Sequence, residues 1–226
     1  MKKKLIATDY DGTLRRLGVI TKKDRKYIEL FRKKGGLFGV VTGRGSDFPK
    51  TAAEDGITCD FFILCNGSLI LDKDGNLIKE FLIPRDIFVS LEKKFETYEG
   101  LRSYSKANDS EFYHHYYSRC DSVEQARQIA DEINKEFGDK VTAFVNGDNV
   151  NIGLKGSSKA EGVRIAAEYF GLTQEDCAVV GDDYNDLDMI VSLHGWAMKT
   201  GRREVRKAAE HLTSSVGALA KELMEM

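Results

Sequence analysis

The sequence predicts an α/β protein with a doubly wound, Rossmann-like parallel sheet and a smaller α+β domain inserted into it. Short apolar runs alternate with amphipathic helical segments in both outer parts of the chain, which is typical of a parallel sheet built from right-handed crossovers. The middle of the chain instead repeats a helix followed by two alternating segments. The apolar runs of the outer parts end in small or polar residues, where ligands of such sheets bind.

The composition is that of an ordinary globular protein. Of 226 residues, 31% are charged, 42% are hydrophobic and two are proline. A net charge of −2 gives no general attraction to nucleic acid or anionic membranes. No apolar run approaches the roughly 20 residues that span a bilayer, and Asp9 interrupts the only stretch that could follow a signal-peptide start. We therefore expect a cytoplasmic protein with four reduced cysteines that acts on neither nucleic acid nor membranes.

The first predicted strand ends in two carboxylates. Residues 5–13 begin with an apolar run and continue through Asp9, Asp11 and Gly12. Positions i and i+2 of an extended chain face the same way, so both acids start out aimed at one point, and Gly12 allows a sharp turn beyond them. One carboxylate could act as nucleophile or metal ligand while the other donates and accepts protons. Taken alone, however, such a string is more commonly a solvated turn.

The rest of the first part alternates helices with strands. Thr21 to Lys34 has the apolar stripe of a helix, which Gly35 and Gly36 end. Polar turns close the next two predicted strands: Thr42-Gly43-Arg44 the first and Asn66-Gly67 the second. The expected elements are strands over 39–41 and 61–65, a helix over 46–55, and a hairpin of 69–71 with 77–80.

The inserted domain contains the same pattern twice, a helix followed by two segments of alternating apolar and polar residues. A helix from Pro84, with Ile87, Leu91, Phe95 and Tyr98 on one face, is followed by two alternating segments, and a second helix is followed by two more. The expected segments after the first helix are 101–105 and 111–118, then a helix over 123–137 and strands over 141–145 and 149–154. We predict a core domain of residues 1–82 and 156–226 and an inserted α+β cap domain of residues 83–155.

The parallel-sheet pattern resumes near Ser158. The sequence Ser158-Lys159-Ala160-Glu161 has the form of a capping box, and Gly171 ends the helix that it opens. A strand over 178–180 follows and ends in an acid-rich turn, residues 181–186. The weaker expectations are strands over 196–198 and 211–213, a helix over 203–210 between them, and a terminal helix over 218–224.

The strand and helix ends carry a matching set of chemical groups. Carboxylates follow two strands, a hydroxyl follows a third, and a lysine lies in the first turn of a helix: Asp9, Asp11, Thr42, Lys159, Asp182, Asp183 and Asp186. Clustered acids suit a hard cation such as Mg²⁺. A hydroxyl, a lysine and free backbone amides suit a phosphoryl group.

In order and spacing these motifs resemble the haloacid dehalogenase (HAD) superfamily of phosphatases. The matching stretches are residues 9–13, 41–44, Lys159 and 181–189. Within the superfamily the chain is similar to the Cof-type branch, whose cap is inserted between the second and third motifs, and Asn66-Gly67-Ser68 also fits that branch. The resemblance implies a magnesium-dependent phosphomonoester hydrolase with a mobile cap.

The resemblance also implies roles for individual residues. Asp9 would attack phosphorus to form an aspartyl-phosphate, and Asp11 would protonate the leaving alcohol and then activate water. Thr42 and the Gly43 amide would bind phosphoryl oxygens. Lys159 would neutralise charge; Lys155, at a strand exit, is the weaker candidate for that role. The further substrate- or phosphate-binding candidates are Arg44, Asn66 and Asn185.

The same resemblance implies which residues would bind the metal and which class of substrate the protein would take. Mg²⁺ would sit on the Asp9 carboxylate, the Asp11 carbonyl and Asp182, with Asp183 and Asp186 as supporting acids. A small sugar phosphate is the first expectation, with a phosphoglycolate-like acid or a phosphomutase reaction as alternatives and a receiver-type phosphoacceptor domain as a distant one. The unranked cap candidates for substrate contact are Arg102, Tyr104, His114, Arg119 and Asn149.

Overall fold

The computed structural model describes residues 4–106 and 113–225. The chain divides into two compact units, one of residues 1–79 with 158–226 and the other of residues 80–157. The cap domain predicted over 83–155 lies inside the second unit. Residues 111 and 112 of the strand expected over 111–118 fall outside the described residues.

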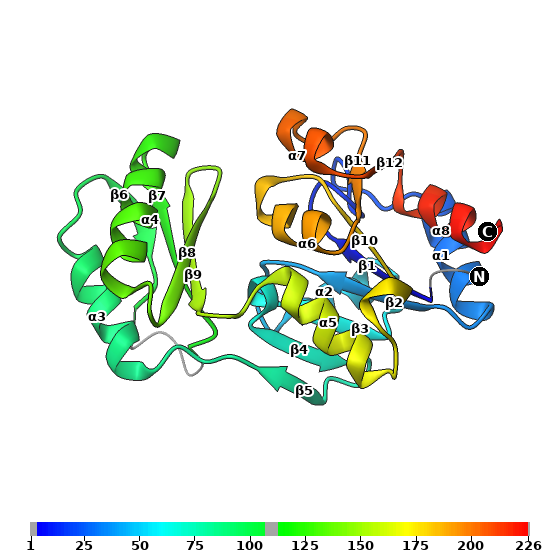
Figure 1. Cartoon of the computed structure of the whole chain (residues 1–226), viewed down its shortest axis with the longest axis horizontal. Coiled ribbons are helices and arrows are strands. Elements are labelled where there is room, and N and C mark those ends of the chain that lie inside the picture. The colour runs from blue at the N-terminus through cyan, green and yellow to red at the C-terminus, as the bar shows by residue number, and fades with distance from the viewer. Residues whose placement is uncertain (1–3, 107–112, 226) are drawn as a thin grey trace. The chain divides into compact units, whose positions relative to one another are not determined.

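The first unit is built on an eight-stranded sheet with the order β12-β11-β10-β1-β2-β3-β4-β5 (Figure 1). The strands from β12 to β3 run parallel, and β4 is antiparallel to β3. The predicted doubly wound parallel sheet is therefore confirmed. The strand bounds are β1 Leu5–Asp9, β2 Leu37–Val41, β3 Phe61–Leu64, β4 Leu69–Asp72, β5 Leu77–Glu80, β10 Cys177–Gly181, β11 Trp196–Met198 and β12 His211–Thr213.

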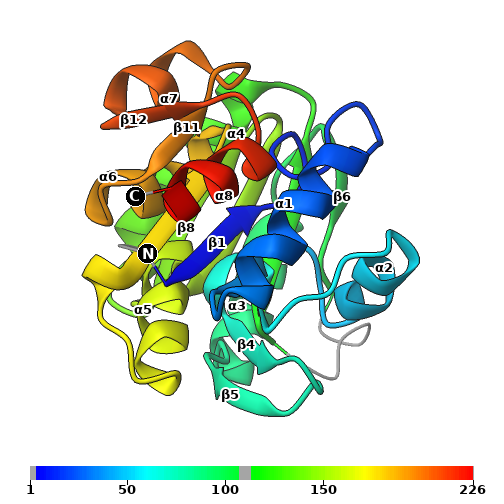
Figure 2. The same cartoon turned by 90° about the vertical axis from the view of Figure 1, so that its right-hand side faces the viewer.

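Helices cover both faces of this sheet. One face packs against α1 (Lys22–Lys33), α2 (Phe48–Glu54) and α8 (Val216–Glu225) through a single apolar cluster. The other carries α5 (Lys159–Tyr169), α6 (Leu187–Ser192) and α7 (Arg203–Ala208). Figure 2 shows α1 and α8 side by side. Because both faces are covered, every residue of β1 is buried, which explains the continuous apolar runs in the sequence.

The strand order places the carboxyl ends of β10, β1 and β2 next to one another. β1 lies between β10 and β2, with Thr8 paired to Val180 and Asp9 paired to Val41. The carboxyl ends of these three parallel strands therefore meet at one edge of the sheet. Ser158 caps α5 at the same edge, since its side chain accepts a hydrogen bond from the Glu161 amide.

The second unit has a four-stranded antiparallel sheet with the order β6-β7-β9-β8. Two helices pack on it through an apolar cluster that includes Phe88, Ile129 and Ile152. The predicted repeat of helix, strand and strand is confirmed. The element bounds are α3 Arg85–Phe95, β6 Leu101–Tyr104, β7 His115–Cys120, α4 Val123–Phe137, β8 Val141–Asn146 and β9 Asn149–Leu154.

One detail of the predicted elements was wrong. Tyr98, expected on the face of the first cap helix, lies beyond the end of α3 at Phe95. No bounds were predicted for the helix α6, which directly follows the 3₁₀ turn Tyr184–Asp186. Asp188 lies in the first turn of α6.

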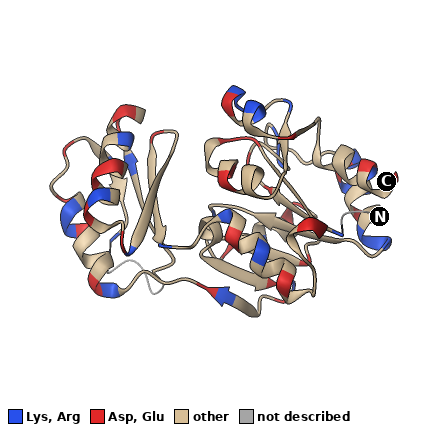
Figure 3. Cartoon of the chain, viewed as in Figure 1, with Lys and Arg blue, Asp and Glu red and all other residues tan. Residues whose placement is uncertain are grey.

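Charged side chains of both signs are mixed on the helices of both units (Figure 3), as the small net charge suggests. All four cysteines are buried and free, which agrees with the expected reduced thiols. Across residues 4–106 and 113–225, no helix has the length and apolar character needed to span a membrane.

Tyr116 is a weak point in the core of the second unit. Its side chain is fully buried between Phe88 and Phe95, yet its hydroxyl has no hydrogen-bond partner among the described residues. An unpaired buried hydroxyl is destabilising, so Tyr116→Phe should raise the free energy of unfolding by about 1 kcal/mol in urea denaturation. Tyr117→Phe is the matched control, because it removes a 2.9 Å bond to Asn149. A lower stability for Tyr116→Phe than for the parent would contradict this prediction.

Candidate functional site

Lys159 lies at the centre of the candidate site. It is the first residue of α5 and is 2% exposed. Its Nζ atom donates to Asp9 Oδ1 at 2.7 Å and to Asp186 Oδ1 at 2.6 Å. Burial alone would lower the pKa of Lys159, but the neighbouring Asp186 and Asp9 carboxylates outweigh it and raise that pKa. The lysine is therefore a fixed positive charge between two acids.

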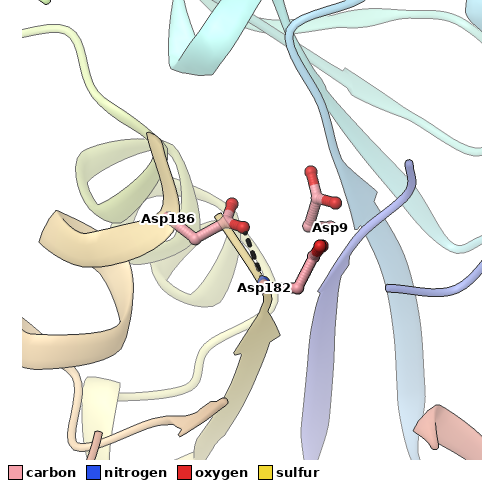
Figure 4. Close-up of side chains that lie close together, drawn as sticks. All are labelled: Asp9, Asp182 and Asp186. Carbon is pink, nitrogen blue, oxygen red and sulfur yellow. Dashed lines mark hydrogen bonds between the residues drawn. The ribbon is translucent and has the colours of Figure 1, made fainter. Parts of the chain in front are cut away.

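Asp9 and Asp182 complete a compact group of carboxylates. Burial, reinforced by Asp186, raises the pKa of Asp9 well above its usual value despite the nearby lysine. Burial also raises the pKa of Asp182 to about 6, and Thr13 Oγ1 donates to Asp182 Oδ1 at 2.5 Å. Asp9, Asp182 and Asp186 can each offer one oxygen within 4.8 Å of the others (Figure 4). Crowded carboxylate oxygens of this kind suit a hard divalent cation.

Asp186 shapes the loop that carries Asp182. Its Oδ2 atom accepts hydrogen bonds from the Asp182 and Asp183 amides at 2.9 and 3.1 Å, the first of which is dashed in Figure 4. A side chain at Gly181 would collide with this carboxyl group. Asp186 therefore positions both Lys159 and the loop backbone.

The remaining predicted site residues of this loop are Asp183 and Asn185. Asp183 accepts from Arg202 Nε at 3.0 Å and from the Tyr184 amide at 2.7 Å, so its carboxylate is held away from the buried acids. Asn185 is half-buried in the short 3₁₀ turn Tyr184–Asp186.

The two acids of the first motif are separated. Both Asp11 carboxylate oxygens accept from Arg44, at 2.8 Å each. The Asp11 side chain is 55% exposed, whereas that of Asp9 is 8% exposed. The i and i+2 rule fails here because β1 ends at Asp9, so Asp11 is not part of the extended strand. Arg44 also lies over the Tyr10 ring, at 5.1 Å from its centroid.

Two residues of the first motif have contacts that sequence reasoning missed. Gly12 has a φ of +90°, and a side chain there would collide with the Asp182 carboxylate. Thr13 supplies the hydrogen bond to that same carboxylate. Their only sequence signal is their place in the motif, because the contact joins residues 169 positions apart.

Thr42, Gly43 and Asn66 lie in two neighbouring turns that are hydrogen-bonded to each other. Thr42 is 2% exposed, and its Oγ1 accepts from the Arg44 amide at 3.2 Å. The Asn66 amide donates to the Thr42 carbonyl at 3.0 Å. An atom in the Cβ position of Gly43 would lie 3.0 Å from Asn66 Oδ1. The turn after β3 is thus hydrogen-bonded to the turn after β2.

The cap candidates contact other residues of their own unit. Arg102 and Arg119 approach Asp148 at 3.0 and 3.3 Å. His114 Nε2 lies 3.2 Å from Glu80, and Asn149 accepts from Tyr117. Tyr104 packs against the apolar cluster of the second unit. Lys155, the weaker lysine candidate, donates to the Gly138 carbonyl at 2.6 Å.

A buried lysine bridging carboxylates at the carboxyl edge of a doubly wound sheet defines an α/β enzyme site. Residues 6–120 and 91–220 match the model of the haloacid dehalogenase-like hydrolases. The chain belongs to this family of hydrolases.

Curated relatives and a solved structure agree with that assignment. The chain is 28% identical to the 5-amino-6-(5-phospho-D-ribitylamino)uracil phosphatase YcsE of Bacillus subtilis, over 94% of this chain and 90% of that protein. It is 26% identical to a phosphoglycolate phosphatase of Archaeoglobus fulgidus, over 95% and 92%. A solved haloacid dehalogenase-like hydrolase from B. subtilis has a TM-score of 0.85 at 18% identity, over 97% and 99%. The family and the names of these relatives support a phosphatase.

Proposed function

We propose that the protein is a magnesium-dependent phosphomonoester hydrolase that forms an aspartyl-phosphate on Asp9. The observation that carries this proposal is the placement of Lys159 between Asp9 and Asp186, with Asp182 beside them. A nucleophilic carboxylate needs nearby positive charge to meet a phosphate dianion, and the buried lysine supplies it.

In the first step, an Asp9 carboxylate oxygen bonds to phosphorus while the bond from phosphorus to the leaving oxygen breaks. Asp11 gives its proton to that oxygen. The Thr42 hydroxyl and the Gly43 amide donate to the phosphoryl oxygens, and Lys159 balances their charge. The Asp11 pair with Arg44 has to open for this step, because both Asp11 oxygens are occupied in the structure.

In the second step, Asp11 takes a proton from water as that water bonds to phosphorus. The bond between Asp9 and phosphorus breaks, which releases inorganic phosphate and restores the Asp9 carboxylate. Asp11 is thus acid and then base, a change of role that suits a carboxyl group at the rim of the site.

The residues present fit a divalent cation. Asp9 and Asp182 would hold it with the Asp11 carbonyl, and Asp186 and Asp183 would orient the loop as supporting acids. When bound, Mg²⁺ would supply positive charge against the three crowded carboxylates and the phosphoryl oxygens. Burial and the neighbouring carboxylates raise the pKa of Asp9 and Asp182, and a nearby cation would favour the charged form of both acids.

For the substrate, we propose a small sugar phosphate or a related phosphorylated polyol. The name of the B. subtilis relative YcsE describes a substrate with phosphate on a ribityl chain, which favours this class. A phosphoglycolate-like acid is the second candidate, because the A. fulgidus relative is named as a phosphoglycolate phosphatase. Comparing kcat/KM on a panel of sugar, polyol and 2-carbon acid phosphates would distinguish them.

Phosphate release from p-nitrophenyl phosphate tests the reaction itself. We expect many turnovers per protein molecule with Mg²⁺, loss of activity in EDTA, and recovery when Mg²⁺ is added in excess, because the crowded acids need a cation to accept a phosphoryl group. At most one phosphate per protein chain would instead indicate a phosphoacceptor domain. Turnover that EDTA leaves unchanged would refute the metal part of the proposal.

A further inference from the structure

Both helices that the structure describes in the second unit, α3 and α4, pack on the same face of its sheet (Figure 1). That face holds Tyr116 of β7 and Val150 and Ile152 of β9. Because successive side chains of a strand point to opposite faces, the residues between these core positions lie on the other face, which we call the helix-free face. Its central residues are Tyr117 of β7, Phe144 and Asn146 of β8, and Asn149 and Asn151 of β9.

Asn151 is a buried asparagine at the centre of the helix-free face. The residue is 9% exposed, and in the internal strand β9 it lies opposite Tyr117 on one side and Phe144 on the other. Its carboxamide forms no hydrogen bond with the chain over residues 4–106 and 113–225. Buried polar side chains are nearly always hydrogen-bonded, so both N–H donors and the oxygen of this group await a partner from outside the chain.

Asn149 shows how the same residue type is used structurally on the same strand and face. Its carboxamide accepts from the Tyr117 hydroxyl at 2.9 Å and donates to the Asn146 carbonyl at 3.0 Å. Asparagine is unfavourable inside strands, and at Asn149 these two contacts compensate for that. No such contact compensates at Asn151, so this second asparagine points to a ligand.

The sheet offers hydrogen bonds without an unpaired cation. Within the bounds of its four strands, the only Lys, Arg, Asp or Glu side chains are Arg102 and Arg119. Both contact Asp148, at 3.0 and 3.3 Å, and Arg102 also contacts Asp121 at 3.2 Å. Two guanidinium groups therefore face two carboxylates. Burial lowers the pKa of His115 to about 4, which leaves its ring neutral at pH 7.

Uncharged hydroxyl groups suit this surface, and a carboxylate does not. A hydroxyl group donates and accepts at once, and a carboxamide offers both kinds of partner. The Phe144 ring, on the strand beside Asn151, provides the apolar surface that small-molecule sites combine with a few polar groups. A carboxylate leaving water would need a positive partner, but Arg102 and Arg119 already have theirs.

We infer that the helix-free face binds the hydroxyl-bearing part of a sugar or polyol phosphate, and that Asn151 selects this part over the carboxylate of a phosphorylated acid. This inference rests on the proposed phosphatase function and decides between its two substrate classes. The Asn151 carboxamide exchanges hydrogen bonds with substrate hydroxyls. It determines specificity and takes no part in breaking the bond to phosphorus.

Asn151→Leu tests this selection, because leucine has the branched shape of asparagine without its hydrogen-bonding groups. We expect kcat/KM for ribitol 5-phosphate with Mg²⁺ to fall about 10- to 100-fold relative to that for p-nitrophenyl phosphate, whose leaving group carries no further hydroxyl. The reason is that one or two hydrogen bonds are lost and substrate hydroxyls are left unpaired. The Tm of the free protein should not fall, because an apolar side chain replaces an unpaired polar one.

Asn149→Leu is the matched control two positions earlier. It removes the acceptor of the Tyr117 hydroxyl and the donor to the Asn146 carbonyl, so we expect a lower Tm and similar changes on both substrates. An Asn151→Leu protein that loses Tm in the same way, or that loses kcat/KM equally on both substrates, would overturn the inference. A parent protein with a higher kcat/KM on 2-phosphoglycolate than on every sugar or polyol phosphate tested would overturn it too.

Calorimetry makes the test independent of turnover. In an Asp9→Asn background with Mg²⁺, the affinity for ribitol 5-phosphate should fall about 10-fold or more when Asn151→Leu is added, and the affinity for inorganic phosphate should fall less. If the parent protein shows no turnover but this fall is seen, the proposed reaction fails and the binding role of Asn151 stands. If the parent turns over and the affinity for ribitol 5-phosphate is unchanged, the inference fails alone. A parent that neither turns over nor binds ribitol 5-phosphate contradicts both.

Discussion

Replacing Asp9 with asparagine is expected to abolish detectable phosphate release. The carboxamide has nearly the shape of the carboxyl group and can still accept from Lys159, but it cannot form the phosphoryl ester. The covalent route is therefore lost, and not only one of its stabilising contacts. Losing a single donor to the phosphoryl group typically costs about 10²- to 10³-fold in rate, so Thr42→Ala should leave measurable turnover. Initial rates on p-nitrophenyl phosphate with Mg²⁺ compare the two variants.

A surface acid provides the control for Asp9→Asn. Asp74 lies in the exposed hairpin turn between β4 and β5 and pairs with Lys73, so Asp74→Asn should keep the parent rate. Thermal melting shows whether the Asp9 variant is folded. A folded Asp9→Asn enzyme with full activity would contradict the aspartyl-phosphate mechanism.

Lys159→Met is expected to affect both activity and stability. The 1% exposed Lys159 side chain faces Asp9 and Asp186 side chains that are 8% and 0% exposed. Removing one partner of such a buried group leaves uncompensated charge and typically destabilises a fold by about 3–5 kcal/mol. The rate should fall at least about 10²-fold, because the phosphoryl charge loses its counter-charge.

The pH dependence of this loss has a definite sign. Burial already raises the pKa of Asp9 in the folded protein above its usual value, and the loss of the neighbouring Lys159 charge should raise that pKa further. Stability from such groups is present at low pH and is lost as the pH rises. Urea denaturation should therefore show a smaller deficit for Lys159→Met at about pH 5 than at about pH 8.

Lys155→Met is the matched control. The Lys155 side chain donates to the Gly138 carbonyl, and the residue is exposed on the second unit. We expect its replacement to change neither the rate nor the free energy of unfolding by a comparable amount. Equal losses in the two variants would show that the role assigned to Lys159 is not specific to it.

Local patterns predicted most of the elements correctly. The capping residue Ser158 and the apolar periods of α1, α3 and α4 mark their helices because each depends only on residues a few positions apart. The motifs also predicted the candidate site residues, because each of these residues follows the end of a predicted strand or lies at the start of a predicted helix.

The pairing of those side chains could not be predicted in the same way. Arg44 takes both oxygens of Asp11, and Asp186 bridges Lys159 to the loop amides. Each partner choice depends on which group is nearer in space after the strands have packed, and several charges compete for each acid. The Asn66 carboxamide oxygen, which has no hydrogen-bond partner among the residues that the structure describes, could not be predicted from the sequence either, because its partners depend on the surrounding packing.

The sequence by itself determined the α/β class, the two-part organisation, and the first strand with Asp9 at its end. Only the tertiary structure decided that Asp9 meets a lysine 150 positions away while Asp11, two positions away, turns to Arg44. The reason is physical: periodicity and turn chemistry act over a few residues, whereas contact across the sheet edge depends on the order in which β10, β1 and β2 pair.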